Sequence, residues 1–155
     1  MNCLNYSFIV LLGLICSCGT SQKTVNNKAM KRIIYTENAS KPIGPYSQGV
    51  LIDEKTLYVS GCVGIIPATG EVVAGNIQDE TKQVMLNLQS ILKAAGMEFS
   101  NVVKATIFLT DLNDFTAMNE IYGAFFTGDY PARETVQVSK LPKNVRVEIS
   151  VIAVR

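Results

Sequence analysis

One long amphipathic segment, set between short alternating segments, constrains the fold of this chain more than any other feature. Apolar residues recur at steps of three and four from Ile77 to Ala95, which predicts a helix with a single buried stripe. Asn76 is placed to cap the start of this helix and Gly96 to end it. A helix with one apolar stripe needs a second layer of structure against which that stripe can be buried.

Six short segments supply that second layer, because they carry the β-branched residues and the alternation typical of strands. A hairpin is predicted where Asp-Glu-Lys separates the second segment from the third, and a further apolar pattern over residues 112–126 predicts a second helix. This order predicts an α+β domain with a mixed six-stranded β-sheet and two helices packed on one face. The predicted strands span residues 31–36, 50–52, 56–61, 101–110, 133–138 and 145–154.

The last predicted strand has one apolar face and one mixed face, because side chains alternate across a strand. A mixed face is seldom left bare, and a symmetric oligomer would bury it, so we expect an oligomer rather than a monomer. The apolar face carries Val147, Ile149, Val151 and Ala153, and the mixed face carries Arg146, Glu148, Ser150 and Ile152.

The N-terminal segment is typical of a targeting sequence. An apolar run from Tyr6 to Ile15, too short to span a bilayer, is followed by Cys-Ser-Cys-Gly. This resembles a bacterial lipoprotein signal peptide over residues 1–17, with Cys18 as the lipidated N-terminus, although no basic residue precedes the apolar run. The alternatives are an uncleaved membrane anchor or a start codon placed too early. The lipoprotein interpretation places the protein in the bacterial cell envelope, lipid-anchored on the periplasmic face of the membrane.

The same interpretation divides the rest of the chain into a polar tether, residues 18–29, and one folded domain, residues 30–155. It also leaves Cys62 as the only cysteine of the folded part, which excludes a disulfide within one mature chain.

Composition excludes several kinds of chemistry. The chain has no histidine, which rules out Ser-His-Asp and Cys-His triads and removes the commonest zinc ligand. Its net charge is only +1, which argues against nucleic-acid binding. Any catalysis must therefore use carboxylates, hydroxyls, thiols, amines or guanidinium groups.

Arg133 is the candidate binding residue that sequence alone singles out, since it opens a predicted strand directly after a Pro-Ala pair. Its fork of donors suits a carboxylate better than lysine does. That anion is either a structural carboxylate, for which Glu148 is the candidate, or a ligand. Glu148 could instead orient a water as a general base. Taken singly, Tyr46 is explained as a packed loop aromatic and Ser60 as a strand-terminal hydroxyl.

Six motifs follow one another along the domain: PIGPYSQG, LYVSG, PATGEVV, VKATIFLTDLNDFTAMNEIYGAFF, PARETVQVSKLP and VEISVIAV. Together they resemble the RidA family, also called the YjgF/UK114 family, from Lys31 to Val154. The resemblance implies a chorismate-mutase-like fold assembled as a homotrimer with pockets at the subunit interfaces. It implies a 2-iminobutanoate/2-iminopropanoate deaminase, which hydrolyses reactive enamines and imines to 2-keto acids and ammonia without a metal or organic cofactor.

The resemblance also implies roles for individual residues. Arg133 matches the family arginine that clamps the substrate carboxylate, and Glu148 matches the glutamate that orients the attacking water. Tyr46 and Ser60 match residues that line the pocket. Thr135 matches the position whose backbone N–H contacts the ligand, and alternation places its side chain on the same side as Arg133. A glutamate close to Arg133 is expected to stay ionised.

Some positions depart from the family pattern or call for a different interpretation. Cys62 and Gly64 replace a glutamine and a proline at the pocket edge. Cys62 is interpreted as a small buried residue, with an oxidisable thiol that gates the pocket as the alternative. Glu134 is expected to face away from Arg133, and Asn119 is interpreted as structural. Two other functions stay open: a non-catalytic binding protein for 2-keto or other small carboxylates, and a nuclease or translation inhibitor.

Overall fold

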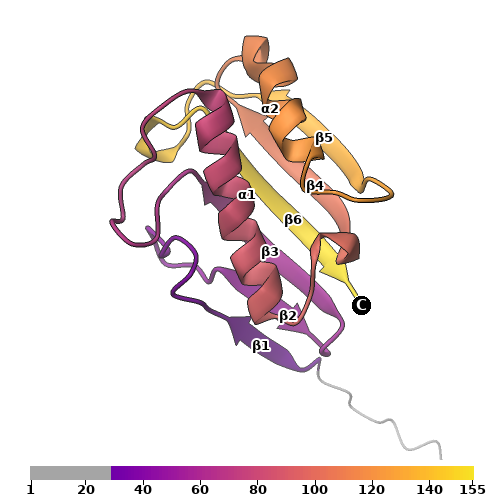
Figure 1. Cartoon of the computed structure of the whole chain (residues 1–155). Helices are drawn as coiled ribbons and strands as arrows, with labels where there is room; N and C mark the ends of the chain where they lie inside the picture. The colour runs from indigo at the N-terminus through magenta and orange to yellow at the C-terminus, as the bar shows by residue number, and fades with distance from the viewer. Residues whose placement is uncertain (1–28) are drawn as a thin grey trace, which may run out of the picture.

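Six strands form one mixed sheet, and both helices lie on the same face of it (Figure 1). The strand order is β1-β2-β3-β6-β4-β5, and every neighbouring pair is antiparallel except β4 and β5, which are parallel. The predicted α+β architecture is therefore confirmed. The strands are β1 (Lys31–Ile34), β2 (Gly49–Ile52), β3 (Thr56–Val63), β4 (Val102–Leu109), β5 (Ala132–Gln137) and β6 (Val147–Val154).

This computed structural model describes residues 29–155. The predicted signal peptide, the lipidation site Cys18 and the tether up to residue 28 lie outside the described residues. Neither helix within the described part is long and apolar enough to cross a membrane.

The long helix α1 (Ile77–Ala94) begins and ends where the sequence predicts. The Asn76 side chain accepts a hydrogen bond from the Asp79 N–H at 3.1 Å, and the Asp79 carboxylate accepts one from the Asn76 N–H at 3.1 Å. This reciprocal pair satisfies two backbone donors that a helix start leaves free. Gly96, just past the end of the helix, has a φ of 71°, a left-handed conformation that favours glycine.

The second helix is shorter than the sequence predicts. A 3₁₀ turn over Leu112–Asp114 leads into α2 (Phe115–Gly123), and residues 124–126 lie beyond the helix. The reason is tertiary packing, because the rings of Phe125 and Phe126 both turn onto Phe99, with centroids 5.5 and 5.2 Å away.

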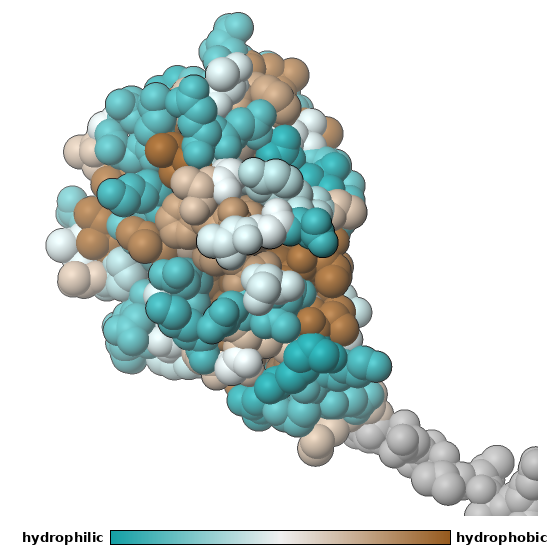
Figure 2. All heavy atoms as spheres, turned by 45° about the vertical axis from the view of Figure 1, so that its right-hand side comes forward, coloured by the Kyte–Doolittle hydropathy of each residue, from teal (hydrophilic) through white to brown (hydrophobic). Residues whose placement is uncertain are grey.

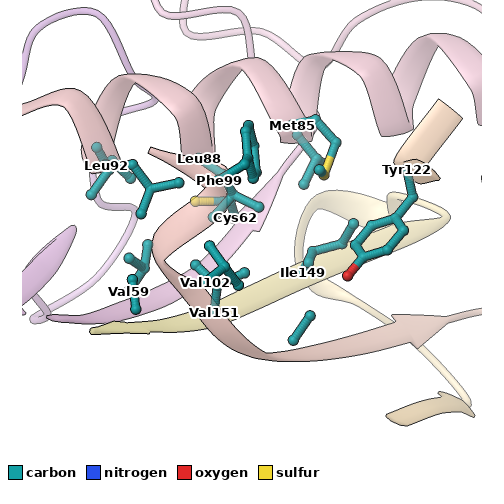
Figure 3. Close-up of a cluster of buried hydrophobic side chains, with 14 of the residues drawn as sticks. Val59, Cys62, Met85, Leu88, Leu92, Phe99, Val102, Tyr122, Ile149 and Val151 are labelled. Carbon is teal, nitrogen blue, oxygen red and sulfur yellow. The ribbon is translucent and has the colours of Figure 1, made fainter. Parts of the chain in front are cut away.

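The core lies between the helices and the sheet (Figure 3). The four apolar residues predicted to share one face of β6 are all buried there, which confirms the alternation. Cys62 is 6% exposed and belongs to the same core, and burial raises the pKa of its thiol to about 12. The interpretation of Cys62 as a small buried residue is confirmed. A bulge between Val59 and Cys62 interrupts the regular alternation of side chains along β3.

The other face of the sheet carries no helix in the described part of the chain. Its residues on β6, Glu148, Ser150 and Ile152, are half-buried, and Tyr58 on β3 is 50% exposed. We call this surface the open face. Its mixed character matches the pattern from which an oligomer was predicted.

Candidate functional site

Arg133 lies on the edge strand β5, on the face that the helices cover, since it pairs with the fully buried Ala105 of β4. Phe115 and Tyr122 of α2 hold its guanidinium. They are seven positions apart and therefore lie on one side of the helix. The guanidinium carbon lies 5.7 Å from the centroid of the Phe115 ring and 5.0 Å from that of the Tyr122 ring. Both distances are within the range of cation–π interactions.

No carboxylate of residues 29–155 forms a salt bridge with Arg133, although the side chain is half-buried. The alternative in which Glu148 is its structural partner is therefore wrong within one chain. A half-buried guanidinium held by rings alone keeps its charge and its fork of donors available for an external anion.

Three buried polar atoms on this side of the sheet have no hydrogen-bond partner among the described residues: Asn119 Oδ1, Tyr122 OH and Thr135 Oγ1. Buried polar atoms are nearly always paired in native proteins, so three on one side of the sheet need an explanation. Asn119, Tyr122 and Arg133 line a single cavity of about 490 Å³ together with Gly123, Tyr130 and Pro131. We call Arg133, Thr135, Asn119 and Tyr122 the clamp half-site.

Thr135 and Glu134 lie on the faces that alternation predicts. Thr135 pairs with the buried Ile107 and shares the helix-covered face with Arg133. Glu134 faces the open side, where it accepts hydrogen bonds from Lys104 Nζ at 2.6 Å and from Thr106 Oγ1 at 2.7 Å.

Glu148 belongs to a second group of residues on the open face. With Tyr46 and Ser60 it lines a cavity of about 230 Å³, which Gly61 also borders. The Ser60 hydroxyl donates to the Ser47 carbonyl at 2.7 Å, and the Tyr46 hydroxyl accepts from the Ile43 N–H at 3.1 Å. We call Glu148, Tyr46, Ser60 and Gly61 the glutamate half-site.

Gly61 is required where Glu148 approaches the backbone of β3. A Cβ atom at position 61 would lie 1.9 Å from Glu148 Oε1, so any larger residue would displace the carboxylate. Burial raises the pKa of Glu148 above its usual value. A carboxylate in these surroundings is suited to accept a proton from a bound water.

The two half-sites lie on opposite faces of the same sheet. Glu148 pairs with Phe108, which pairs in turn with Val136, three residues beyond Arg133 on β5. Arg133 and Glu148 are therefore two strand spacings apart across the sheet and three residues apart along it, and each of these separations is about 10 Å. Within one chain, the two side chains are too far apart to contact the same small molecule. The expected effect of a nearby Arg133 on Glu148 does not arise within one chain, where burial alone shifts the Glu148 pKa.

Two residues of the clamp half-site, both of which line the cavity, were not among the site residues predicted from sequence. Tyr122 was assigned to the apolar pattern of the second helix, and Asn119 was interpreted as structural. Their spacing from Phe115, at i+4 and i+7, was the available signal, because it places all three on one helix side.

Comparison with known proteins gives consistent matches. A family model described as Endoribonuclease L-PSP matches residues 36–155. A goat (Capra hircus) protein named 2-iminobutanoate/2-iminopropanoate deaminase is 52% identical over 126 residues, which cover 81% of this chain and 91% of that protein. The human protein of the same name is 48% identical with the same coverage.

Solved structures agree with these sequence matches. Escherichia coli TdcF with bound serine has a TM-score of 0.77 at 43% identity, over 80% of this chain and 98% of that chain. A Thermotoga maritima protein described as a putative endoribonuclease has a TM-score of 0.78 at 45% identity, over 81% and 98% of the two chains.

Proposed function

This chain belongs to the endoribonuclease L-PSP family, that of the RidA/YjgF proteins, and from that membership we propose that it is a 2-iminobutanoate/2-iminopropanoate deaminase. The observation that carries the proposal is the 52% identity to a named deaminase over nearly the whole domain. The reaction adds water across the C=N bond of a 2-imino acid and releases a 2-keto acid and ammonia.

The clamp half-site binds the substrate carboxylate in this proposal. Arg133 donates two parallel hydrogen bonds to the two carboxylate oxygens, and the backbone N–H of Thr135 donates a third. An iminium carbon is already electrophilic, so fixing its position relative to one water supplies much of the rate enhancement. The serine bound to the TdcF relative is itself a small amino acid with a carboxylate, which is consistent with such a clamp.

The glutamate half-site orients the attacking water and accepts its proton. Glu148 accepts a proton as the water oxygen bonds to the imine carbon, and a tetrahedral amino alcohol forms. Glu148 then returns this proton to the nitrogen, the C–N bond breaks and ammonia leaves, and Glu148 accepts the hydroxyl proton as the keto group forms. Loss of that proton to solvent restores the carboxylate. Tyr46 and Ser60 line the space in which the water and the imine meet. All of these steps use side chains of this protein and need no metal or organic cofactor.

The two half-sites meet, in this proposal, between neighbouring subunits of a homotrimer. Their places on opposite faces of the sheet support this, because a second copy can bring its open face to the clamp of the first. Figure 2 shows apolar surface between hydrophilic regions on one side of the molecule. Exposed apolar side chains on and beside α2 and β5 also support a subunit contact. These side chains are Leu112, Phe115, Tyr130 and Val136, each at least 38% exposed.

We further propose that a lipid on Cys18 anchors the protein to the periplasmic face of the membrane in the cell envelope. The support is the apolar run followed by Cys-Ser-Cys-Gly. Replacing Cys18 with alanine should move the protein from the membrane fraction to the soluble fraction of a bacterial host. If wild type and variant fractionate alike, the anchor is not formed through Cys18.

The test of the deaminase is the release of ammonia from freshly generated 2-iminobutanoate, followed beside the loss of imine that semicarbazide can trap. We expect the wild type to accelerate both, and Arg133→Ala to lose the acceleration. A wild type that binds 2-oxobutanoate without accelerating imine loss would be a carboxylate-binding protein instead. RNA cleavage with a steep salt dependence would favour a nuclease, which the net charge of +1 argues against.

A further inference from the structure

Tyr122 is the most deeply buried residue of the clamp half-site, with 3% of its surface exposed. Its hydroxyl has no hydrogen-bond partner among residues 29–155. Figure 3 shows the ring directed from α2 toward the sheet, with the oxygen at its far end. A buried hydroxyl without a partner loses its contact with water and gains nothing in return, so the fold alone does not explain this oxygen.

The ring of Tyr122, in contrast, is fully explained by packing. Its centroid lies 4.8 Å from that of Phe126, and the Arg133 guanidinium carbon lies 5.0 Å from it. Phenylalanine would make both contacts equally well. The hydroxyl and the ring therefore have separable roles, and only the hydroxyl calls for a ligand.

We propose that the Tyr122 hydroxyl is an additional carboxylate-binding group, which donates a hydrogen bond to the carboxylate that Arg133 clamps, while the Tyr122 ring holds the guanidinium in place. Thr135 Oγ1, also buried without a partner and on the same face as Arg133, is a second neutral donor for the same anion. The inference deepens the proposed function and relies on it for the identity of the ligand.

The protonation state of Tyr122 is consistent with a donor. Burial raises the pKa of its phenol to about 12, although the nearby guanidinium works in the opposite direction. The phenol therefore keeps its proton throughout the physiological range and can donate to an anion. Neutral donors suit a carboxylate that one guanidinium already neutralises, because they add hydrogen bonds without adding charge.

Tyr122→Phe separates this role from a structural one. The variant keeps the ring and removes only an oxygen that the free protein leaves unpaired, so the free energy of unfolding of the free protein should not fall. Because the carboxylate is bound in both the ground state and the transition state, its lost hydrogen bond should raise KM and leave kcat unchanged. We expect a rise of at least about tenfold, the ratio for one hydrogen bond to a charged group.

The experiment measures Kd for 2-oxobutanoate by calorimetry, KM and kcat for 2-iminobutanoate, and urea unfolding of the free protein. Tyr35→Phe is the matched control, because it removes an exposed hydroxyl that donates to Glu37 at 2.9 Å, at the end of β1 and outside both half-sites. Thr135→Val is a second variant that removes one hydroxyl at nearly constant volume, and it should raise Kd and KM in the same direction.

A Tyr122→Phe protein of unchanged stability with raised Kd and KM would support the inference. Wild-type Kd and KM in that variant would overturn it, as would a loss of stability that accounts for the loss of binding. If the wild type binds 2-oxobutanoate, needs the Tyr122 hydroxyl to do so and hydrolyses no imine, the deaminase proposal fails while this inference stands. If the wild type hydrolyses the imine and Tyr122→Phe changes neither Kd nor KM, the deaminase proposal stands and this inference fails.

Discussion

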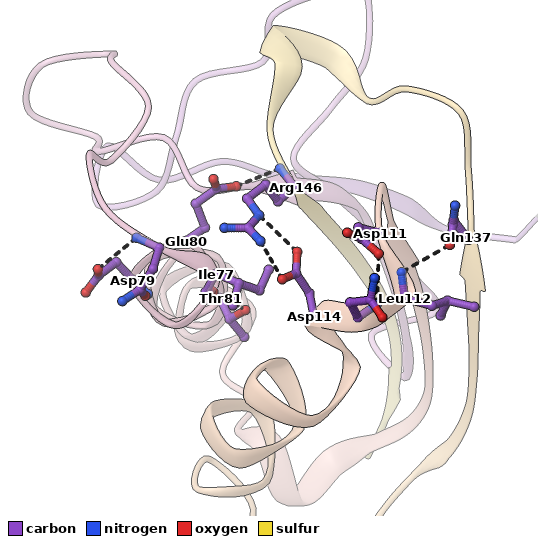
Figure 4. Close-up of polar contacts among 11 residues, drawn as sticks. Ile77, Asp79, Glu80, Thr81, Asp111, Leu112, Asp114, Gln137 and Arg146 are labelled. Atoms are coloured by element: carbon purple, nitrogen blue, oxygen red, sulfur yellow. Dashed lines mark hydrogen bonds and ion pairs between the residues drawn. The ribbon is translucent and has the colours of Figure 1, made fainter.

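Two arginines of this protein lie in opposite electrostatic situations. Arg146 forms a two-pronged ion pair with Asp114, with Nε 2.9 Å from Oδ2 and the second contact between Nη2 and Oδ1 (Figure 4). Its backbone N–H also donates to Glu80 at 2.8 Å, and both carboxylate residues are only 7% exposed. Arg133 has two aromatic rings beside it and no salt bridge within residues 29–155.

The difference separates an arginine that stabilises the fold from one that is available to a ligand. Arg146 connects the start of β6 to the turn before α2 and, through Glu80, to α1, so its charge is used within the domain. Arg133 is held in place without being neutralised. The half-buried Arg133 has no salt bridge within the described residues, and three polar atoms on the same side of the sheet have no hydrogen-bond partner there. Such a group of residues is suited to bind an anion from outside the chain.

Arg133→Ala should have the largest effect on activity and little effect on stability. Losing a bidentate carboxylate clamp should lower kcat/KM by at least about 100-fold. The free energy of unfolding should change by only about 1 kcal/mol, because only cation–π contacts are lost. Arg133→Lys keeps the positive charge but loses the forked pair of donors, so its kcat/KM should lie between those of the wild type and Arg133→Ala. Steady-state kinetics and urea unfolding check both parts, and a large loss of stability would contradict the comparison.

Glu148→Gln should lower kcat by roughly 100-fold, the range of a lost general base. In the wild type, activity should fall as pH is lowered through the Glu148 pKa, because a protonated carboxyl cannot accept the proton of the attacking water. The pH profile of kcat measures this, and an acid limb that persists unchanged in Glu148→Gln would contradict it.

The raised pKa of Glu148 also predicts how the free energy of unfolding changes with pH. Because the folded protein holds the Glu148 proton more tightly than the unfolded chain does, its contribution to stability is fully present below the ordinary glutamate pKa. That contribution is lost as pH rises through the raised pKa. Urea titrations across this window should show the loss in the wild type and a flatter profile in Glu148→Gln.

Asp114→Asn should affect activity least, because Asp114 pairs with Arg146, the arginine that stabilises the fold. The Asp114 side chain is 9% exposed but that of Arg146 is 42% exposed, so water screens part of the pair. We expect the free energy of unfolding to fall by about 1–3 kcal/mol, with kcat/KM per folded molecule unchanged. A specific loss of activity in fully folded Asp114→Asn protein would remove the distinction between the two arginines.

Local features of the fold could be predicted from the sequence because local patterns determine them. The stripe and caps of α1 and the alternation of β6 depend on residues a few positions apart. The end of α2 was placed too late, since the packing of Phe125 and Phe126 on Phe99 is a contact between distant segments. Arg146 was assigned only to a mixed strand face, because its partner Asp114 lies 32 residues away.

Sequence named several residues that line the two cavities, but not how these residues are arranged. Alternation correctly grouped Arg133 with Thr135, which are neighbours on one strand. It could not relate Arg133 to Glu148, because their relative faces depend on the register of β5 against β4 and of β4 against β6. The separation of the clamp from the glutamate is therefore information that only the three-dimensional structure supplies.

Mixing two inactive variants tests most directly whether these half-sites come from different subunits. Arg133→Ala and Glu148→Gln proteins would be unfolded together in equal amounts, refolded, and assayed for imine hydrolysis beside each variant treated alone. In a trimer with interfacial sites every mixed assembly regains one intact site, so about a quarter of wild-type activity should return. A mixture no more active than its parents would contradict the account and place each complete site within one subunit.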